Sequence, residues 1–596
     1  MKKILLFLFS ISFLTFSQNI SPYLESKISQ IKTKEYIPVI IELNEKIDLN
    51  QLKVDFEIDK IKIKDRASIL AKKLQDKYKK SQEKLLKKIT LYPNDYKDLH
   101  QFWAVNMIYL KATPRLIKKL ENDILIKNID IELGNMQIIE SKSNPQHELS
   151  GGNGTEPGIE AINVRPLWEM GYTGKGTLVF NYDTGVWPTH PAFSNRFFGN
   201  FYPMEQCWDG YFSDTPNGFN DHGTHTMGII GGLVSETNDT IGSSFECYWI
   251  ANDYVTSTVE ELPPVVEMVT SFEWSLNPDG DLSTSFDVPD VINNSWRWYN
   301  PIDTVQCEGY IVELMNVIET AGIGNIFSAG NDGPNNAGVK APQRINTNVV
   351  NTFCVGSINA NVEDLMISTF STRGPTQCPS EGGSLEIYPE VSAPGQAVRS
   401  ASGENGFDVK SGTSMAAPHV TGCFLLLKEA FPFLSGEEIL LAIYYTAVDL
   451  GEEGEDNIYG MGIIDGFAAF NYLSEMYDPV LPNNNSDDIS IAQISNIPDK
   501  ISCQNSFEPI IKIKNHGNSI IDGIKISVIN NESIINEFIF SELSIGSGEE
   551  LEINLESIDN FNYGDIELCF IVESLNFIDE IDYHNNRRMV RFKHKP

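Results

Sequence analysis

Cysteine is scarce in this chain, and it is not arranged for metal binding. Only eight cysteines occur among 596 residues, and no two of them form a C-x-x-C pair. Structural zinc clusters usually need such pairs, so their absence argues against a zinc-finger type of site. Disulfides remain open, and among the many pairings we favour Cys503 with Cys569, since both lie in the C-terminal segment. Cys423, in an apolar helical pattern, is expected to be a buried free thiol.

Long apolar runs are also lacking after the first residues. No later stretch is long and apolar enough to span a bilayer. The start has Lys2-Lys3, a mostly apolar run over residues 4–14, and Thr15-Phe16-Ser17. This pattern is typical of a secretory signal peptide, so we expect residues 1–17 to be removed and the mature protein to be exported and soluble.

Basic residues are few, and most of them lie near the N-terminus. The chain has 45 Lys and Arg against 81 Asp and Glu, a net charge of −36. Residues 1–150 hold 26 basic and 19 acidic side chains, whereas the remainder holds 19 and 62. The acidic body argues against nucleic acid and anionic membranes as partners. The basic leader could be an intramolecular partner that is attracted to the acidic body. Alternatively, each segment simply has its own surface composition.

The length and the pattern of elements predict several folded units. Residues 18–150 indicate a small α+β unit that ends in an exposed, cleavable stretch over 141–154. Its expected elements are strands over 37–43, 102–112 and 124–131 and helices over 66–89 and 114–121, the last opened by Thr113.

Residues 151–477 alternate strands and helices, with apolar runs over 176–182, 288–293 and 324–328 and a helical pattern over 309–320. This predicts an α/β fold with a doubly wound, mostly parallel sheet and a site at the carboxyl ends of its strands. A linker over 478–490 follows. Residues 491–596 alternate short strands and turns, which predicts an all-β sandwich; the expected strands are 510–514, 523–529, 551–555 and 566–572.

The candidate nucleophile is Ser414, in the string Gly412-Thr413-Ser414-Met415-Ala416-Ala417-Pro418-His419. Apolar residues at three- and four-residue steps after it predict a helix, with Pro418 in the first turn, where a missing N–H is tolerated. A serine at a helix N-terminus has unpaired N–H groups and the positive end of the helix dipole beside it. Such a place suits stabilisation of an oxyanion.

A serine nucleophile also needs a base, a carboxylate to orient that base, and a donor for the oxyanion. Three upstream strings offer these groups. Asp183-Thr184-Gly185 ends the first predicted strand, His222-Gly223-Thr224-His225 opens a helix, and Ser328-Ala329-Gly330-Asn331 ends a later strand. Each string alone could be an ordinary turn or helix start, but together they supply a complete set of groups for acyl transfer.

These residues, in the order Asp183, His222 and Ser414, resemble the triad of the subtilisin-like serine proteases, the subtilases. The resemblance covers about residues 156–470 and includes Gly171 to Gly176, Val391 to Gly395 and Gly460 to Asp465. Trp274 and the string Pro289 to Trp296 are most similar to the bacillopeptidase F branch. The family implies a secreted bacterial serine endopeptidase that needs no cofactor for its chemistry and acts on protein or peptide substrates.

The resemblance also implies a role for each matching residue. Ser414 would attack the scissile carbonyl, His222 would act as base and then acid, and Asp183 would hold the imidazole tautomer. Asn331 and Thr413 would serve the oxyanion hole, together with the N–H of Ser414. The family's substrate-binding segments correspond here to Ser295, Trp296 and Arg297 and to Ser328, Ala329 and Gly330.

One of these segments departs from the family. Small residues usually follow the equivalent of Ser295, whereas this chain has Trp296-Arg297-Trp298-Tyr299. Bulky side chains there would narrow the substrate site, add aromatic contacts, or favour acidic residues through Arg297.

The flanking regions carry weaker resemblances. The leader is similar to the inhibitory prodomain of the family, which implies a self-processed zymogen cut between about Ser141 and Glu156. The C-terminal segment resembles the adhesion-related β-sandwich called CARDB, which implies contact with a surface, a glycan or a protein, or else a passive spacer.

Metal binding has two candidate sites, and the metal ligands stay unknown. His222 and His225 have a spacing that can hold zinc, but no third ligand of the H-E-x-x-H kind follows, so we expect His225 and His419 to pack between helices.

Structural calcium is common in the family, and Asn277 to Asp281 with Asp287 and Asp290 would supply oxygen ligands. Their spacing does not fit an EF-hand, and a solvated acidic turn is the simpler interpretation.

Features of the sequence argue against two other functions. A catalytically silent adhesin would use the protease fold only as a scaffold, but the intact Asp183, His222, Asn331 and Ser414 argue against it. An esterase of the α/β-hydrolase kind needs a G-x-S-x-G elbow and the order Ser, Asp, His, and both are absent at Ser414.

Overall fold

The computed structural model describes residues 19–595 except 33, 133–134, 138–153, 219, 257–262, 300–306, 335–337, 381, 483–487, 499, 503–505, 518, 532, 560–563 and 577–583. Contacts divide the chain into two compact units. The first comprises Met1–Ile47 and Lys73–Leu133, and the second comprises Asp48–Lys72 and Gly134–Pro596. The segment Asp48–Lys72 therefore belongs to the leader in sequence but groups with the second unit.

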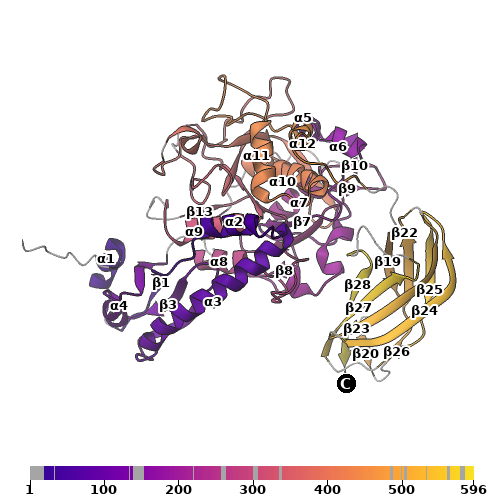
Figure 1. Ribbon diagram of the computed structural model, residues 1–596, viewed down its shortest axis with the longest axis horizontal. Helices are drawn as coiled ribbons and strands as arrows, with labels where there is room; N and C mark the ends of the chain where they lie inside the picture. Colours follow the sequence, from indigo (N-terminus) through magenta and orange to yellow (C-terminus); the bar gives the residue numbers. More distant parts are fainter. Residues whose placement is uncertain are drawn as a thin grey trace, which may run out of the picture. The chain divides into compact units, whose positions relative to one another are not determined.

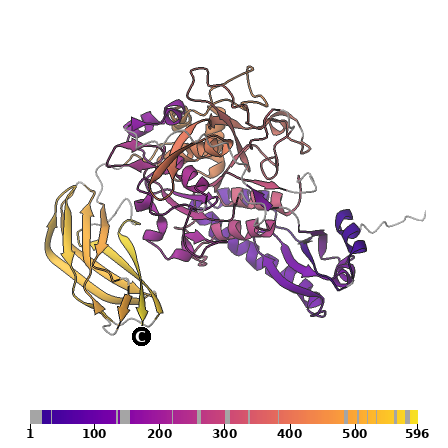
Figure 2. The same ribbon diagram turned by 180° about the vertical axis from the view of Figure 1, so that it is seen from behind.

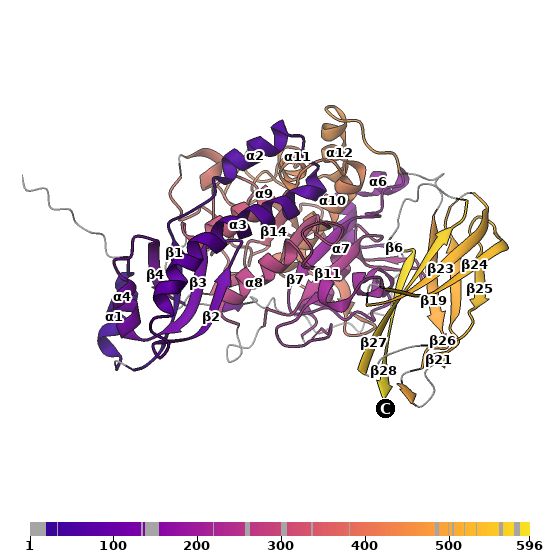
Figure 3. The same cartoon turned by 60° about the horizontal axis from the view of Figure 1, so that its bottom comes forward.

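The first unit is α+β, as the sequence predicts; it has a four-stranded antiparallel sheet, whose strands Figure 3 shows side by side. The sheet has the order β2-β3-β1-β4. Its elements are α1 (Pro22–Gln30), β1 (Ile37–Leu43), the later part of α3 (Ile63–Ile89), β2 (Tyr96–Phe102), β3 (Met107–Ala112), α4 (Pro114–Leu120) and β4 (Ile126–Ile131). The hydroxyl of Thr113 caps α4 by accepting the N–H of Leu116 at 3.4 Å.

The single strand expected over 102–112 is wrong, because the chain turns back between β2 and β3. Residues 103–106 form the turn, and Phe102 pairs with Met107. Buried Asn106 stabilises the turn by donating from its side chain to the carbonyl of Glu45 at 2.7 Å. A side-chain bond to a distant residue is not visible in the apolar alternation that predicted one strand.

The second unit is built on a seven-stranded sheet of the order β16-β15-β14-β12-β7-β11-β8, in which every pairing is parallel. Its strands are β7 (Leu178–Tyr182), β8 (Trp208–Asp209), β11 (Tyr248–Asn252), β12 (Val291–Asn294), β14 (Gly324–Ser328), β15 (Phe353–Ile358) and β16 (Val391–Pro394). The first strand in sequence, β7, lies between β11 and β12. The strand order therefore reverses beside β7, which is where sites form in doubly wound folds.

Helices cover both faces of this sheet (Figure 1), so the predicted doubly wound fold is confirmed. The helices are α2 (Leu49–Ile58), the start of α3, α5 (Pro157–Ala161), α6 (Arg165–Glu169), α7 (His222–Gly231), α8 (Val265–Ser275), α9 (Tyr310–Thr320), α10 (Thr413–Ala430), α11 (Gly436–Tyr445) and α12 (Gly466–Ser474). Three smaller sheets accompany the seven-stranded sheet: β5 (Asn135–Gln137) with β13 (Arg297–Tyr299), β10 (Asp239–Thr240) between β6 (Gly154–Thr155) and β9 (Leu233–Val234), and β17 (Val398–Ser402) with β18 (Gly406–Lys410).

Helix α10 packs against α7 and against strands β12, β14, β15 and β16, and nearly all of its residues are buried. The sequence predicts Pro418 in the first turn of this helix, but it lies in the second turn. Because proline has no N–H, the carbonyl of Ser414 four residues earlier gets no helical bond from this position. The hydroxyl of Ser295 donates to that carbonyl instead, at 3.1 Å.

The C-terminal strands form two main sheets around one apolar core, as predicted, and Figure 2 shows them in yellow. One sheet has the order β19-β22-β25 and the other β20-β28-β27-β23-β24. The strands are β19 (Ile489–Ser495), β20 (Lys500–Ser502), β21 (Ser506–Phe507), β22 (Ile510–Asn515), β23 (Ile521–Asn530), β24 (Ser533–Ile545), β25 (Glu550–Asn554), β26 (Ile558–Asp559), β27 (Gly564–Ser574) and β28 (Arg587–Lys595).

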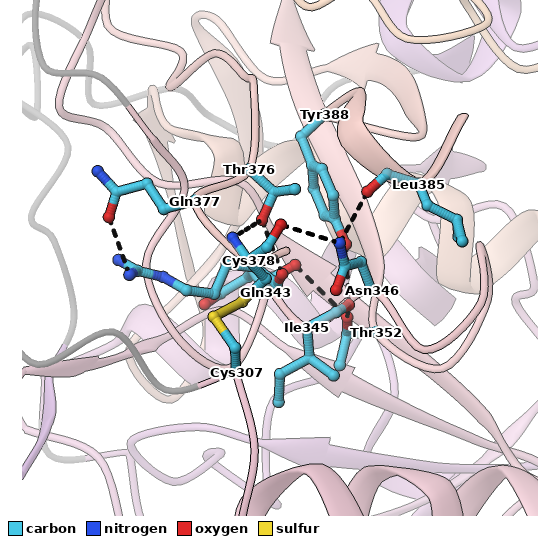
Figure 4. The surroundings of a disulfide bond; sticks show 11 residues. Cys307, Gln343, Ile345, Asn346, Thr352, Thr376, Gln377, Cys378, Leu385 and Tyr388 are labelled. Carbon is cyan, nitrogen blue, oxygen red and sulfur yellow. Dashed lines mark hydrogen bonds between the residues drawn. A yellow bond between two sulfur atoms is a disulfide. The ribbon is translucent and has the colours of Figure 1, made fainter. Parts of the chain in front are cut away.

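A disulfide that sequence reasoning missed joins Cys307 to Cys378 (Figure 4). The prediction for Cys423 is confirmed, since it is a buried free thiol. Cys503, the expected partner of Cys569, lies outside the described residues. Within the described part of the chain, none of the helices has the length and apolarity that a membrane span requires.

Candidate active site

Asp183 directly follows β7 at the carboxyl edge of the parallel sheet and is fully buried. Its carboxylate accepts the N–H of Thr184 at 2.8 Å through Oδ1 and the hydroxyl of Thr226 at 3.3 Å through Oδ2. The backbone N–H of Asp183 is held by the side-chain oxygen of Asn252, on the neighbouring strand, at 2.9 Å. Asp183 is therefore held through its carboxylate by Thr226 of α7 and through its backbone by Asn252 of β11.

His222 is the first residue of α7, and its imidazole lies against this carboxylate. Its Nδ1 is 2.7 Å from Oδ1 of Asp183, and the side chain is 8% exposed. A carboxylate on Nδ1 keeps the proton on that nitrogen and leaves Nε2 as the basic atom. Within the described residues, Nε2 of His222 has no hydrogen-bond partner, so it is available to accept a proton.

Ser414 is the second residue of α10 and is buried. Its hydroxyl donates to the carbonyl of Ser295 at 3.3 Å, while the hydroxyl of Ser295 donates to the carbonyl of Ser414 at 3.1 Å. These reciprocal bonds hold the start of α10 against the residue that follows β12. A hydroxyl that donates to a carbonyl in the free protein can rotate and donate to a base when substrate binds, because catalytic hydrogen bonds often form fully only in the enzyme–substrate complex.

Asn331 and Thr413 meet beside the candidate nucleophile, Ser414. The side-chain oxygen of Asn331 accepts the N–H of Thr413 at 2.9 Å and its hydroxyl at 3.0 Å. The hydroxyl of Thr413 also accepts the N–H of Gly330 at 2.9 Å. Since its oxygen is bound in this way, the amide of Asn331 is set in one flip state, next to the residue that precedes Ser414.

Strand β13 begins two residues after Ser295, which contacts the candidate nucleophile Ser414. It pairs antiparallel with β5, with Arg297 opposite Gln137, Trp298 opposite Met136 and Tyr299 opposite Asn135. The leader thus supplies an extended segment that adds one strand to this edge, which is how extended peptides bind to exposed sheet edges.

The side chain of Trp296 does not lie at this edge. It is 2% exposed and packs in the core, with its ring 5.1 Å from that of Tyr182 and 5.8 Å from that of Phe327. Of the three alternatives for this segment, an aromatic contact between substrate and the ring of Trp296 does not fit the burial of that ring. Tyr182 and Phe327 lie on strands that flank β12, so the large ring covers the end of the sheet.

Arg297 is not an isolated cation, because it forms an ion pair with Asp332. The carboxylate of Asp332 offsets the charge of Arg297, which weakens the hypothesis that Arg297 favours acidic substrate residues. Ser328, Ala329 and Gly330 lie where the sequence predicts, at the end of β14 and in the loop that leads to Asn331.

Sequence reasoning missed Gln343, which has no motif around it. Its side-chain amide donates to the carbonyls of Trp296, at 2.6 Å, and Ser328, at 3.0 Å. It thus contacts both predicted substrate-binding segments. Only its position after β14, in the segment that leads to β15, could have drawn attention to it.

The other histidines of these helices are buried, as expected. His225 bonds through Nε2 to the carbonyl of Asp408 at 3.1 Å, and burial lowers its pKa well below the ordinary value. His419 bonds through Nδ1 to the carbonyl of Met415 at 2.8 Å, and burial lowers its pKa to about 4. Both histidines are thus held neutral within the packing of α7 and α10.

The acidic segment considered for calcium forms hydrogen-bonded turns. Buried Asp287 accepts the N–H of Asp279 at 2.7 Å, and Asp279 accepts the N–H of Asp281 at 2.8 Å. Across the residues that the structure describes, no three His, Cys, Asp or Glu side chains are grouped so that they could hold a metal ion.

Comparison with known proteins agrees with this geometry. The model of the subtilase family matches residues 174–462. Bacillopeptidase F of Bacillus subtilis (strain 168) is 28% identical over 421 residues, which cover 66% of this chain and 28% of that protein. An extracellular serine protease of Serratia marcescens is 29% identical over 365 residues, covering 53% and 33%. A thermostable alkaline protease of Halalkalibacterium halodurans is 27% identical over 368 residues, covering 61% and 83%.

The chain spans a third or less of the length of the first two relatives. The match nevertheless includes every element that supplies Asp183, His222, Asn331 and Ser414, so the resemblance drawn from the local strings is confirmed. Residues 174–462 therefore belong to the subtilase family of serine proteases.

Proposed function

We propose that this chain is a secreted serine endopeptidase, made as a self-processed zymogen, that cuts proteins through an acyl-enzyme on Ser414. The observation that carries the proposal is the bond of 2.7 Å between Nδ1 of His222 and Asp183, with Nε2 of His222 left without a partner among the described residues. This is the arrangement that a general base needs, and the subtilase match supports its assignment to peptide hydrolysis.

In the first step, the hydroxyl of Ser414 attacks the scissile carbonyl and its proton passes to Nε2 of His222. The imidazolium that forms is stabilised by the carboxylate of Asp183. The carbonyl oxygen becomes an oxyanion, and the side-chain amide of Asn331 and the N–H of Ser414 donate to it. Thr413 orients Asn331 through the two bonds described above.

In the second step, the tetrahedral intermediate collapses and the bond from carbon to nitrogen breaks. The leaving amine takes the proton from His222, and the acyl group stays on Ser414. Water then attacks the ester with His222 again as base, which frees the acid product and restores the serine.

The pairing of β5 with β13 supports the zymogen. A leader segment that occupies the edge strand excludes a substrate from the same hydrogen bonds. The leader also provides Lys53, which forms ion pairs with buried Glu319 and, at 2.9 Å, with Glu437. These contacts fit the hypothesis of a basic leader attracted to an acidic body. The expected cleavage stretch over 141–156 lies almost wholly outside the described residues.

The proposal is tested with purified protein, a fluorophosphonate probe that labels activated serines, and a mixed peptide library read by mass spectrometry. We expect labelling and peptide cleavage by the wild type, and neither by Ser414→Ala. A protein that is not labelled would be the silent scaffold, and one that cuts esters but no peptide would be an esterase. Either result would overturn the proposed function.

A further inference from the structure

The side chain of Gln343 links the two backbone segments that meet at the nucleophile. It is 1% exposed, and its amide nitrogen donates to the carbonyl of Trp296 at 2.6 Å and to that of Ser328 at 3.0 Å. Trp296 leads into β13, where the extended leader segment pairs. Ser328 ends β14, three residues before Asn331. One buried amide therefore joins the substrate-pairing edge to the segment that carries the oxyanion donor.

A second bridge joins the same two segments. Arg297 of β13 forms an ion pair with Asp332, the residue after Asn331, and the two side chains are 17% and 22% exposed. The backbone N–H of Asp332 is in turn held by the hydroxyl of Thr372 at 3.1 Å. In one segment, the two bridges attach at successive residues, Trp296 and Arg297. In the other segment, they attach on either side of Asn331.

We propose that Gln343 and the Arg297–Asp332 pair are positioning residues that set the distance between the substrate-pairing edge and the Asn331 amide. The inference rests on the proposed peptide hydrolysis. A substrate held on β13 by its backbone is stabilised in the transition state only if its oxyanion lies about 2.7–3.1 Å from the donor. An error of about 1 Å in such a geometry costs about 100-fold in rate.

The pairing of β12 with β14 sets this distance only as far as Asn294 and Phe327, where the ladder between the two strands ends. The two bridges continue the constraint beyond that point, and the segment that carries Gln343 is itself held by further bonds. The carbonyl of Ala341 accepts the N–H of Trp298 at 2.9 Å, so the segment with Gln343 is also attached directly to β13. The same segment is held by Tyr388, whose hydroxyl donates to the carbonyl of Ile345 at 2.8 Å, close to the Cys307–Cys378 disulfide (Figure 4).

The test compares a long peptide that pairs along β13 with a single-residue ester that does not reach this edge. Gln343→Leu keeps the volume and removes both donated bonds. We expect its kcat on the long peptide to fall about 10- to 100-fold with KM nearly unchanged, because the lost alignment acts on the transition state. The activity on the ester should change about twofold or less, since an ester that is not pinned to β13 can adjust to Asn331.

The matched control is Asn346→Leu, in the same segment. Asn346 donates to the carbonyls of Cys378, at 3.4 Å, and Leu385, at 2.9 Å, and to neither substrate-binding segment. Its variant should lose thermal stability much as Gln343→Leu does, yet keep the ratio of peptide to ester activity. Equal ratios in the two variants would overturn the inference, because the effect of Gln343 would then be purely structural.

The second bridge gives an independent test at partly exposed positions. If Arg297 and Asp332 act as one unit, then Arg297→Ala, Asp332→Asn and the double variant should lose the same fraction of kcat on the long peptide, and Arg297→Lys should restore part of it. Losses that multiply in the double variant would overturn the pairing.

A wild type inactive on both substrates would overturn the proposed function, whereas an active wild type with unaltered bridge variants would overturn only this inference.

Discussion

The side-chain oxygen of Asn331 accepts two hydrogen bonds from Thr413, one from the backbone at 2.9 Å and one from the hydroxyl at 3.0 Å. These bonds connect the loop after β14 with the first turn of α10, and so with Ser414. The amide that is proposed to bind the oxyanion is thus oriented by the residue that precedes Ser414. Preorganised donors of this kind need no rearrangement during the reaction.

The first prediction concerns this pair. Asn331→Leu removes the donor and should lower kcat about 100- to 1,000-fold with little change in KM. Thr413→Val keeps the backbone bond but removes the hydroxyl, so we expect a smaller loss, about 10-fold, from a less well oriented amide. Steady-state kinetics on one peptide would check both values. A rise in KM at constant kcat would instead assign Asn331 to ground-state binding.

The second prediction locates the self-cleaved bond. Arg297 pairs with Gln137, and the hydroxyl of Ser414 rests on the carbonyl of Ser295, two residues before Arg297. We expect this antiparallel register to continue for two residues beyond Gln137, which would set position 139 opposite Ser295 and predicts cleavage between Ile139 and Glu140, just before the stretch first expected. N-terminal sequencing of the processed protein would check this bond.

The control for that experiment is Ser414→Ala, which should remain an uncut precursor. A new N-terminus at Gln137 or earlier, or normal processing of Ser414→Ala in the purified state, would contradict the prediction. Processing within 141–156 would show that the register of β5 does not extend to the scissile bond.

The third prediction concerns pH. The base of the proposed mechanism accepts a proton only in its neutral form, so kcat/KM should rise from acid to neutral pH. A pH profile under conditions in which chemistry limits the rate would check this. A flat profile over the same range would contradict the role of His222.

The fourth prediction concerns the stability of the acidic turn. Burial, aided by the charges of Asp279 and Asp281, raises the pKa of Asp287 to about 7, from an ordinary value of 3.8. An acid whose pKa is raised in the folded state contributes its full stability below the unfolded pKa, and this contribution is lost as the pH rises through the folded pKa. Asp287→Asn does not titrate, so its melting temperature relative to the wild type should increase between pH 4 and 8, by roughly 2–4 °C.

Melting curves at pH 4, 6 and 8 in a chelating buffer would check this shift. Asp281→Asn is the control, because Asp281 is exposed and no comparable trend is expected from it. If added calcium stabilised the wild type at pH 8 and not Asp287→Asn, the segment would be a cation site, and the interpretation as a plain acidic turn would be wrong.

Much of the fold could be predicted because its elements have local signatures. The apolar runs that became β7, β12 and β14 lie within two or three residues of the ranges expected from sequence, and α9 begins one residue later than expected. The failures have local causes as well. A turn centred on buried Asn106 divides an apparently continuous strand, and Pro418 lies one turn further into α10 than the pattern indicated.

The chemistry of the candidate site was determined by the sequence itself. Asp183, His222, Asn331 and Ser414 each follow a strand or open a helix, and short-range geometry is enough to direct such residues to one edge of a parallel sheet. What surrounds them was decided only by the tertiary structure. The burial of Trp296, the Arg297–Asp332 pair, the two bonds of Gln343 and the Cys307–Cys378 disulfide all join residues distant in sequence. Such contacts depend on which surfaces meet when the sheet and helices pack, and no local pattern records that choice.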